Sequence, residues 1–372
     1  MPQQCGAMSA AGDIRTTAQQ SNLATLALSG EPVQAQPPLR ARPSSIVNGL
    51  TRHDLLSAHA ALRIGKTRRV RRLAQRALVR GARADDRSTQ AEAALVLSHA
   101  YVLESRFSLA RLTSARASRL FVADSNATGQ AEALAILSYS ASALGLDAQA
   151  LQAADDGIAL RDASAAPLGH ACGMNYLGVA SFWAGDFATA RRVLEASIWF
   201  ADQAGDASVG FQPLVNLCFV EVLRIVDAER KVHGGTADLS ELEQLVSRAR
   251  TMAATGQVGC FNPGIRDIAF VLLDFSCCFI ASRWGHTEAA DAFYLACLER
   301  SRRLPANSWL HAVLWWARAE RAIGYGDIDK SIASLEAMAE AARCGEHAQL
   351  QALAATLESA LRPALNQSDS RS

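Results

Sequence analysis

Apolar residues recur along most of the chain at the i, i+3, i+4 and i+7 positions that place them on one face of a helix. These faces come in pairs, and the clearest pair runs from Leu177 to Ser197 with Gly185 between its two helices. A Gly or Ser suited to the turn between two helices recurs about every 40 residues, and this spacing is interrupted once, after Lys231. The recurring turn residues are Gly65, Ser105, Gly145, Gly285 and Gly326. Because a single helix pair cannot bury its own apolar faces, the pattern predicts stacked pairs.

The repeat also sets the expected domain organisation. Residues 51–362 hold about seven helix pairs, with an insertion near 231–238 that contains a Gly-Gly dipeptide. Residues 1–50 are rich in Gln, Ala, Ser and Pro without an apolar period, which is typical of a disordered leader. Residues 363–372 are expected to form a flexible tail. The sequence therefore predicts one all-α domain rather than two or three ordinary ones.

Two helix starts have the spacing of a capping box. Thr89 is followed by Glu92, and Ser240 is followed by Glu243. In a capping box the hydroxyl and the acidic side chain satisfy free N–H groups at the start of a helix. We therefore expect helices to begin at these positions.

The residues of the clearest pair resemble the tetratricopeptide repeat (TPR) family. The pattern includes Leu177-Gly178, an aromatic residue at 182 and 183, and Gly185-Asp186-Phe187, followed by small residues. The unit is longer than the family's 34 residues, and Met174 stands where the family has Trp. The resemblance implies a right-handed superhelical solenoid of antiparallel helix pairs, whose concave groove binds a protein or peptide.

A second resemblance concerns the stretch from Phe211 to Arg224, which is similar to the sensory regions of bacterial diguanylate cyclases that carry long TPR units. The Gly-Gly pair at 234–235 is followed by Thr-Ala rather than by an acidic pair, so the cyclase motif is missing. This leaves two interpretations open: a protein-binding scaffold with a regulatory or sensory role, or a detached or truncated sensor module of such a cyclase.

The candidate groove residues lie at aligned positions of the first helix of each unit. Aromatic anchors among a few polar groups suit protein recognition. We expect Phe219, Phe275 and Phe279 to be core residues between the repeats. The residues expected to face a partner are Glu92, His99, Glu132, Tyr139, Asn175, Trp183, Gln212, Arg283, Trp316 and Glu320.

A basic patch is the strongest local charge feature. Arg69, Arg72, Arg76 and Arg80 lie on one face of a predicted helix, opposite an apolar face. They could bind an acidic partner, a nucleotide or anionic lipid, or they could form the solvated face of the first unit. No aromatic residues are interleaved with them for base stacking, so nucleic acid is not the expected partner.

Composition excludes several other classes of function. The chain has 37 Lys and Arg against 36 Asp and Glu, so no overall field favours nucleic acid or membrane. The longest apolar run, 268–281, is too short for a membrane span. Metal-ligand spacings and nucleophile or phosphate-loop motifs are missing, so we expect no catalytic site, metal or cofactor. The expected protein is cytoplasmic and binds a protein or peptide; whether it forms a homodimer is open.

Overall fold

The structure is a computed structural model that describes residues 45–161, 166–231, 238–260, 266–302, 304–305 and 308–369, and these form fifteen α-helices and no strand. The first helices of successive pairs are α1 (Ser45–Arg63), α3 (Arg87–Leu103), α5 (Ala127–Ala143), α7 (Pro167–Trp183), α9 (Phe211–Lys231), α11 (Arg266–Arg283) and α13 (Leu310–Gly324). The second helices are α2 (Thr67–Arg83), α4 (Phe107–Ala123), α6 (Asp147–Ala159), α8 (Phe187–Gln203), α10 (Ser240–Ala254), α12 (Thr287–Ser301) and α14 (Ile328–Cys344). A short 3-10 helix, η1 (Ala207–Gly210), precedes α9, and α15 (Ala348–Asp369) follows the last pair.

The ends of the helical region differ from the expected boundaries. Helix α1 begins at Ser45, within the segment 1–50 that the sequence predicts as a leader. Helix α15 continues through Pro363 into the predicted tail. The helices of the described residues form seven pairs. The rest of the leader, 1–44, residues 232–237 of the insertion and the last residues, 370–372, lie outside the described part of the chain.

The turns between helices share one geometry. Gly185 has φ +81°, and its N–H donates to Phe182 O while the next N–H, of Asp186, donates to Ser181 O. This is the Schellman arrangement, which satisfies free carbonyls at a helix end and needs a left-handed residue. Ser105 occupies the equivalent position with φ 52° and the same pair of bonds. Many of the helices have 17 residues. Two such helices and the two three-residue turns that follow them make up one 40-residue unit.

Helix starts differ from the predicted capping boxes. Helix α3 begins at Arg87, and its N-cap is Asp86, whose carboxylate accepts from the N–H and the hydroxyl of Thr89. The prediction that Thr89 starts the helix is therefore wrong. Helix α10 does begin at Ser240, but its backbone N–H donates to Asp238. In each case an aspartate two or three residues earlier accepts from a free backbone N–H at the start of the helix.

The first helices of successive pairs pack against one another, and we call them the inner layer and the second helices the outer layer. Each of α3, α5, α7, α9, α11 and α13 packs against the first helix of the preceding pair as well as its own partner. Twelve of the 17 residues of α5 are buried, compared with four of the 13 residues of α6. The inner layer therefore carries most of the core.

Small residues lie where the helices of a pair approach most closely. Ser98, Ser138 and Cys218 are 0% exposed and occupy the same place in three first helices. Gly178 is their equivalent in α7, and a Cβ built there would lie 2.5 Å from Cγ of Leu194 in α8. A larger residue at this position would push the pair apart, because protein interiors have no spare volume.

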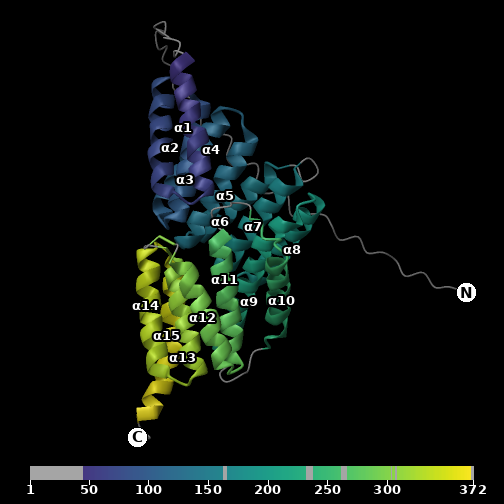
Figure 1. Cartoon of the computed structure of the whole chain (residues 1–372), viewed down its shortest axis with the longest axis vertical. Helices are drawn as coiled ribbons and strands as arrows, with labels where there is room; N and C mark the ends of the chain where they lie inside the picture. Colours follow the sequence, from purple (N-terminus) through teal and green to yellow (C-terminus); the bar gives the residue numbers. More distant parts are fainter. Residues whose placement is uncertain are drawn as a thin grey trace, which may run out of the picture. The chain divides into compact units, whose positions relative to one another are not determined.

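The last units also contact the first ones (Figure 1). The N–H of Trp309, just before α13, donates to Ser105 Oγ at 3.0 Å, and the Ser108 N–H donates to Glu346 at 2.7 Å. His347, between α14 and α15, is buried with its ring centroid 5.8 Å from that of Phe107. Two further rings surround it, Trp183 at 4.9 Å and Trp309 at 5.1 Å. We call this contact the closure.

The first prediction concerns the small-residue positions. Gly178→Ala should lower the free energy of unfolding by about 1 kcal/mol, because the cost of overpacking at the Leu194 contact, about 2 kcal/mol, exceeds the ~1 kcal/mol that Ala gains in helix propensity. The control is Gly49→Ala in α1, where a Cβ would meet no atom within 4 Å. It should leave stability unchanged or raise it. Urea unfolding followed by circular dichroism measures both; equal effects of the two variants would contradict the packing argument.

The second prediction concerns the pH dependence of stability. Burial lowers the pKa of His347 to about 3 from 6.5, and the Leu350 N–H donates to its Nδ1. The unfolded state therefore binds the proton more readily than the folded state. As a result, this group lowers the free energy of unfolding by about 2 kcal/mol as the pH falls from 6.5 to 5. His347→Phe should reduce this pH dependence, measured as the difference from wild type between pH 6.5 and 5. Parallel curves would show that His347 does not titrate in the unfolding transition.

Candidate functional site

Three cavities follow one another along the inner layer. The N-terminal cavity, about 230 Å³, lies between α1, α3, α5 and α7. The central cavity, about 50 Å³, lies between α5, α7, α9 and α11 and is bordered by the closure. The C-terminal cavity, about 320 Å³, lies between α9, α11, α13, α14 and α15. Together they make up what we call the groove.

The N-terminal cavity gathers titratable side chains. His59 Nε2 lies 3.0 Å from an oxygen of Glu92, while His99 and Glu132 line the wall beside them. Burial, and to a lesser extent the neighbouring His59, lowers the pKa of His99 to about 4. Burial of its carboxyl raises the pKa of Glu132, although the positive charge of Arg161 opposes this shift. The cavity thus holds a neutral imidazole at neutral pH.

The central cavity is largely aromatic and aliphatic with an amide cluster on one side. Asn216 Nδ2 donates to Asn175 Oδ1 at 2.9 Å, and Gln212 lines the same wall. Asn175 is 0% exposed, and its Nδ2 has no hydrogen-bond partner among the described residues. Burial raises the pKa of Tyr139, whose ring packs edge-on against that of Tyr176.

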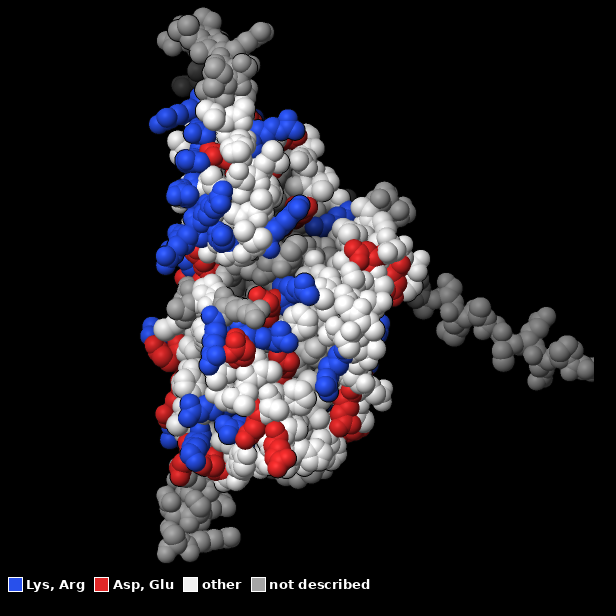
Figure 2. Space-filling model, in the orientation of Figure 1, with Lys and Arg blue, Asp and Glu red and all other residues white. Residues whose placement is uncertain are grey.

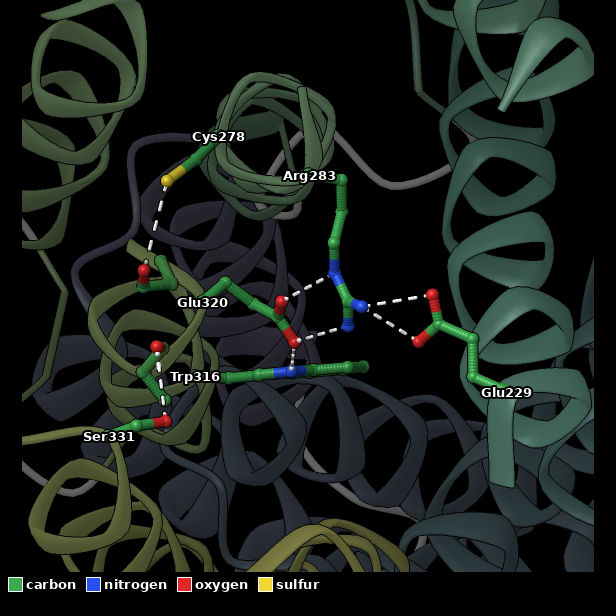
Figure 3. A network of polar contacts seen from close by, with 8 residues as sticks. Glu229, Cys278, Arg283, Trp316, Glu320 and Ser331 are labelled. Atoms are coloured by element: carbon green, nitrogen blue, oxygen red, sulfur yellow. Dashed lines mark hydrogen bonds and ion pairs between the residues drawn. The ribbon is translucent and has the colours of Figure 1, made fainter. Parts of the chain in front are cut away.

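The C-terminal cavity contains a network centred on one arginine (Figure 3). Arg283, at the end of α11, donates through Nη1 to both oxygens of Glu229, at 2.9 and 2.8 Å. Its Nε donates to Glu320 of α13 at 3.0 Å, and Trp316 Nε1 donates to the same carboxylate at 2.9 Å. The guanidinium also lies over the Phe279 ring, 4.8 Å from its centroid. One positive charge is therefore shared by two carboxylates.

Most of the predicted groove residues line one of the three cavities, and Glu92 and Trp316 do not. Their role in binding stays a prediction. His99 and Glu132 line the N-terminal cavity, whereas Glu92 contacts it only through His59. Trp316 lies behind the groove, fully buried against Glu320. Those that line the other two cavities are Tyr139, Asn175, Trp183 and Gln212 in the centre and Arg283 and Glu320 at the C-terminal end.

Several groove residues were not anticipated from the sequence. His347 and Trp309 reach the central cavity from turns late in the chain, and Glu229 lies in the last turns of α9, beyond the repeat pattern. Helix α15 adds Leu353 and Leu357 to the wall of the C-terminal cavity. Its apolar period was the available signal, but nothing in the repeat indicates that this unpaired helix lies beside the groove.

The predicted basic patch lies on the outer helix α2, which carries seven arginines and no acidic residue (Figure 2). Arg76 and Arg80 each lie 2.5 Å from an oxygen of Asp54 in α1, a residue that is 3% exposed. Arg69 and Arg72 are exposed. Two of the four arginines therefore hold α2 against α1, and the binding role of the patch stays a prediction.

Two further observations concern other kinds of site. Within the described ranges, no group of three or more His, Cys, Asp or Glu side chains could hold a metal ion. One helical stretch there, Ala207–Lys231, is long and apolar enough to cross a membrane, but 89% of its most apolar 18-residue part is buried inside the fold. We therefore assign it to the core.

Comparisons with known proteins show similarity of structure rather than of sequence. No protein-family model and no curated protein matches the chain. The structure of the apo form of RapI is similar with a TM-score of 0.58 at 12% identity, over 79% of this chain and 98% of that one. A Rap protein complexed with Competence and Sporulation Factor has a TM-score of 0.52 at 11% identity, over 85% and 99%.

A tetratricopeptide repeat protein from Parabacteroides merdae has a TM-score of 0.43 at 10% identity, over 80% of this chain and 99% of that one. At such identities the similarity of the two Rap structures concerns the fold alone. The predicted fold class is confirmed by the helices, turns and stacked pairs described above. The resemblance to cyclase sensory regions stays a prediction. The chain therefore has an all-α, TPR-like solenoid fold.

Proposed function

We propose that the chain is a non-enzymatic scaffold that holds a protein or peptide partner in its groove, with a regulatory or sensory role in the cytoplasm. The central cavity of the groove offers aromatic rings and amide groups side by side, among them Tyr139, Trp183 and Asn175. Such anchors carry most of the energy of protein recognition. Its aliphatic and aromatic walls suit the side chains of an extended segment or a helix.

The observation that carries this proposal is the Asn175 side chain. An unpaired buried amide N–H₂ costs about 1–3 kcal/mol, so an apolar residue would give a more stable core at that place. The neighbouring Asn216 donates to its oxygen and thereby directs the free N–H₂ group away from that pair. A carbonyl oxygen of a partner backbone would satisfy it. Trp183, partly exposed beside it, offers an aromatic anchor.

The structural neighbours support the same proposal. One of the Rap structures was solved as a complex with Competence and Sporulation Factor, so a chain of this fold holds a partner. At 11% identity the partner itself does not carry over to this chain.

The third prediction tests the groove with Asn175→Leu. The change removes an unsatisfied amide but also the acceptor of Asn216, which is partly exposed and can bond to water instead, so the melting temperature should stay about the same. Capture of the specific partner from native lysate should fall at least tenfold, measured by quantitative mass spectrometry. Gln203→Leu, the same kind of change on the exposed face of α8, is the matched control and should capture like wild type.

Two outcomes would contradict the proposal that the groove binds the partner. One is an unchanged partner set in Asn175→Leu. The other is loss of capture in a chain that lacks residues 1–44, with full capture by Asn175→Leu, which would place the binding determinant before α1.

A further inference from the structure

The C-terminal cavity differs from the rest of the groove in its charge. Arg283 and Glu320 are held among buried groups, with side-chain exposures of 22% and 2%, and Glu229 is 24% exposed. Two carboxylates thus share one guanidinium in a poorly solvated place. Burial, and less so the charge of Glu320, raises the pKa of Glu229 against the effect of Arg283. This shift agrees with one negative charge in excess.

Glu229 is more open to a further donor than Glu320, because its side chain is 24% exposed and that of Glu320 is 2% exposed. Glu320 already accepts from Trp316 and from two nitrogens of Arg283. Glu229 accepts from a single nitrogen of Arg283, and a carboxylate offers about four lone-pair sites. Asp227 is a different case, because the exposed Arg230 and Lys231 both pair with it at the rim. The acceptor capacity of the network that a ligand can reach therefore lies mainly on Glu229.

The walls of this cavity are aliphatic. Leu223 of α9, Ile323 of α13 and Leu353 and Leu357 of α15 line it. A volume of about 320 Å³ lies at the lower end of the ~300–1,000 Å³ that ligand pockets occupy. A ligand that fits must therefore join an apolar stem to a compact cationic end. A lysine side chain has this form, since its ammonium is a point charge with three donors on a four-carbon stem.

We propose that the C-terminal cavity takes a lysine side chain of the partner segment, flanked by aliphatic residues, with its ammonium at Glu229 and its stem against α15. The proposal rests on the proposed function, because it names the chemistry of the partner that the groove holds. Arginine fits less well, since a planar guanidinium needs a bidentate acceptor and Arg283 already occupies that edge of Glu229.

The fourth prediction uses defined probes on the purified full chain. By titration calorimetry or ligand-observed NMR, n-octylammonium should bind at least tenfold more tightly than n-octanol, and octanoate should not bind. Acetyl-leucyl-lysyl-leucinamide should likewise bind at least tenfold more tightly than its norleucine counterpart. The factor of ten is about the effect of one charge-assisted hydrogen bond.

Two variants assign this binding to the cavity. Glu229→Gln leaves Arg283 paired with Glu320, so the fold should persist, and it should abolish the preference for the ammonium over the alcohol. Ala360→Trp, at an exposed lining position of α15, should block both probes by filling the space. The matched control is Glu299→Gln, because that residue is exposed and paired with Arg302 and should leave probe binding unchanged.

Each remaining outcome decides the proposal. Equal binding of ammonium and alcohol, or an ammonium preference that survives Glu229→Gln, would overturn it. Binding of octylammonium without the lysyl peptide would make a free amine the occupant and overturn the lysine. If the probes bind as expected but Asn175→Leu captures the same partners as wild type, the cation site would be supported and the proposed function of the groove would be contradicted.

Discussion

Close approach of the two helices within each pair is the constraint on which the rest of the structure depends. Residues such as Ser98, Ser138 and Gly178 leave room for the facing helix, and the three-residue turns fix where each helix begins. Because 17 residues of helix span about 25 Å, successive units repeat the same geometry and their first helices fall into one layer. The groove is a consequence of this layer, since its side chains come from equivalent faces of successive helices.

The closure divides the groove and sets its chemistry. His347 brings a turn near the C-terminal end of the chain into a cluster of rings with Phe107 and Trp183. The contact removes the imidazole from water and keeps it neutral, as its lowered pKa indicates. A partner in the central cavity would therefore contact early and late units at once. Binding energy gained there would add to the contact between the units.

Two charge clusters show opposite arrangements. At α2, two arginines share the buried Asp54, and the positive charge in excess lies on the surface, where solvent screens it. At α11, two carboxylates share Arg283, and the negative charge in excess lies in a cavity, where screening is weak. The first arrangement is satisfied by water and salt. In the second, the ammonium of the proposed ligand would offset the excess charge, so we propose the binding site at the inner cluster and not at the more conspicuous basic helix.

The sequence by itself determined the helical fold, the 40-residue period and the turn positions, because these follow from local backbone geometry and from the spacing of small and apolar residues. It also placed Asn175, Trp183 and Arg283 on helix faces that line the groove. Only the tertiary structure decided that Asp86 caps α3, that Asp54 neutralises part of the basic patch, and that Glu229 and α15 complete the last cavity. Such contacts join residues that no common period relates, so they depend on how the stacked units meet in space.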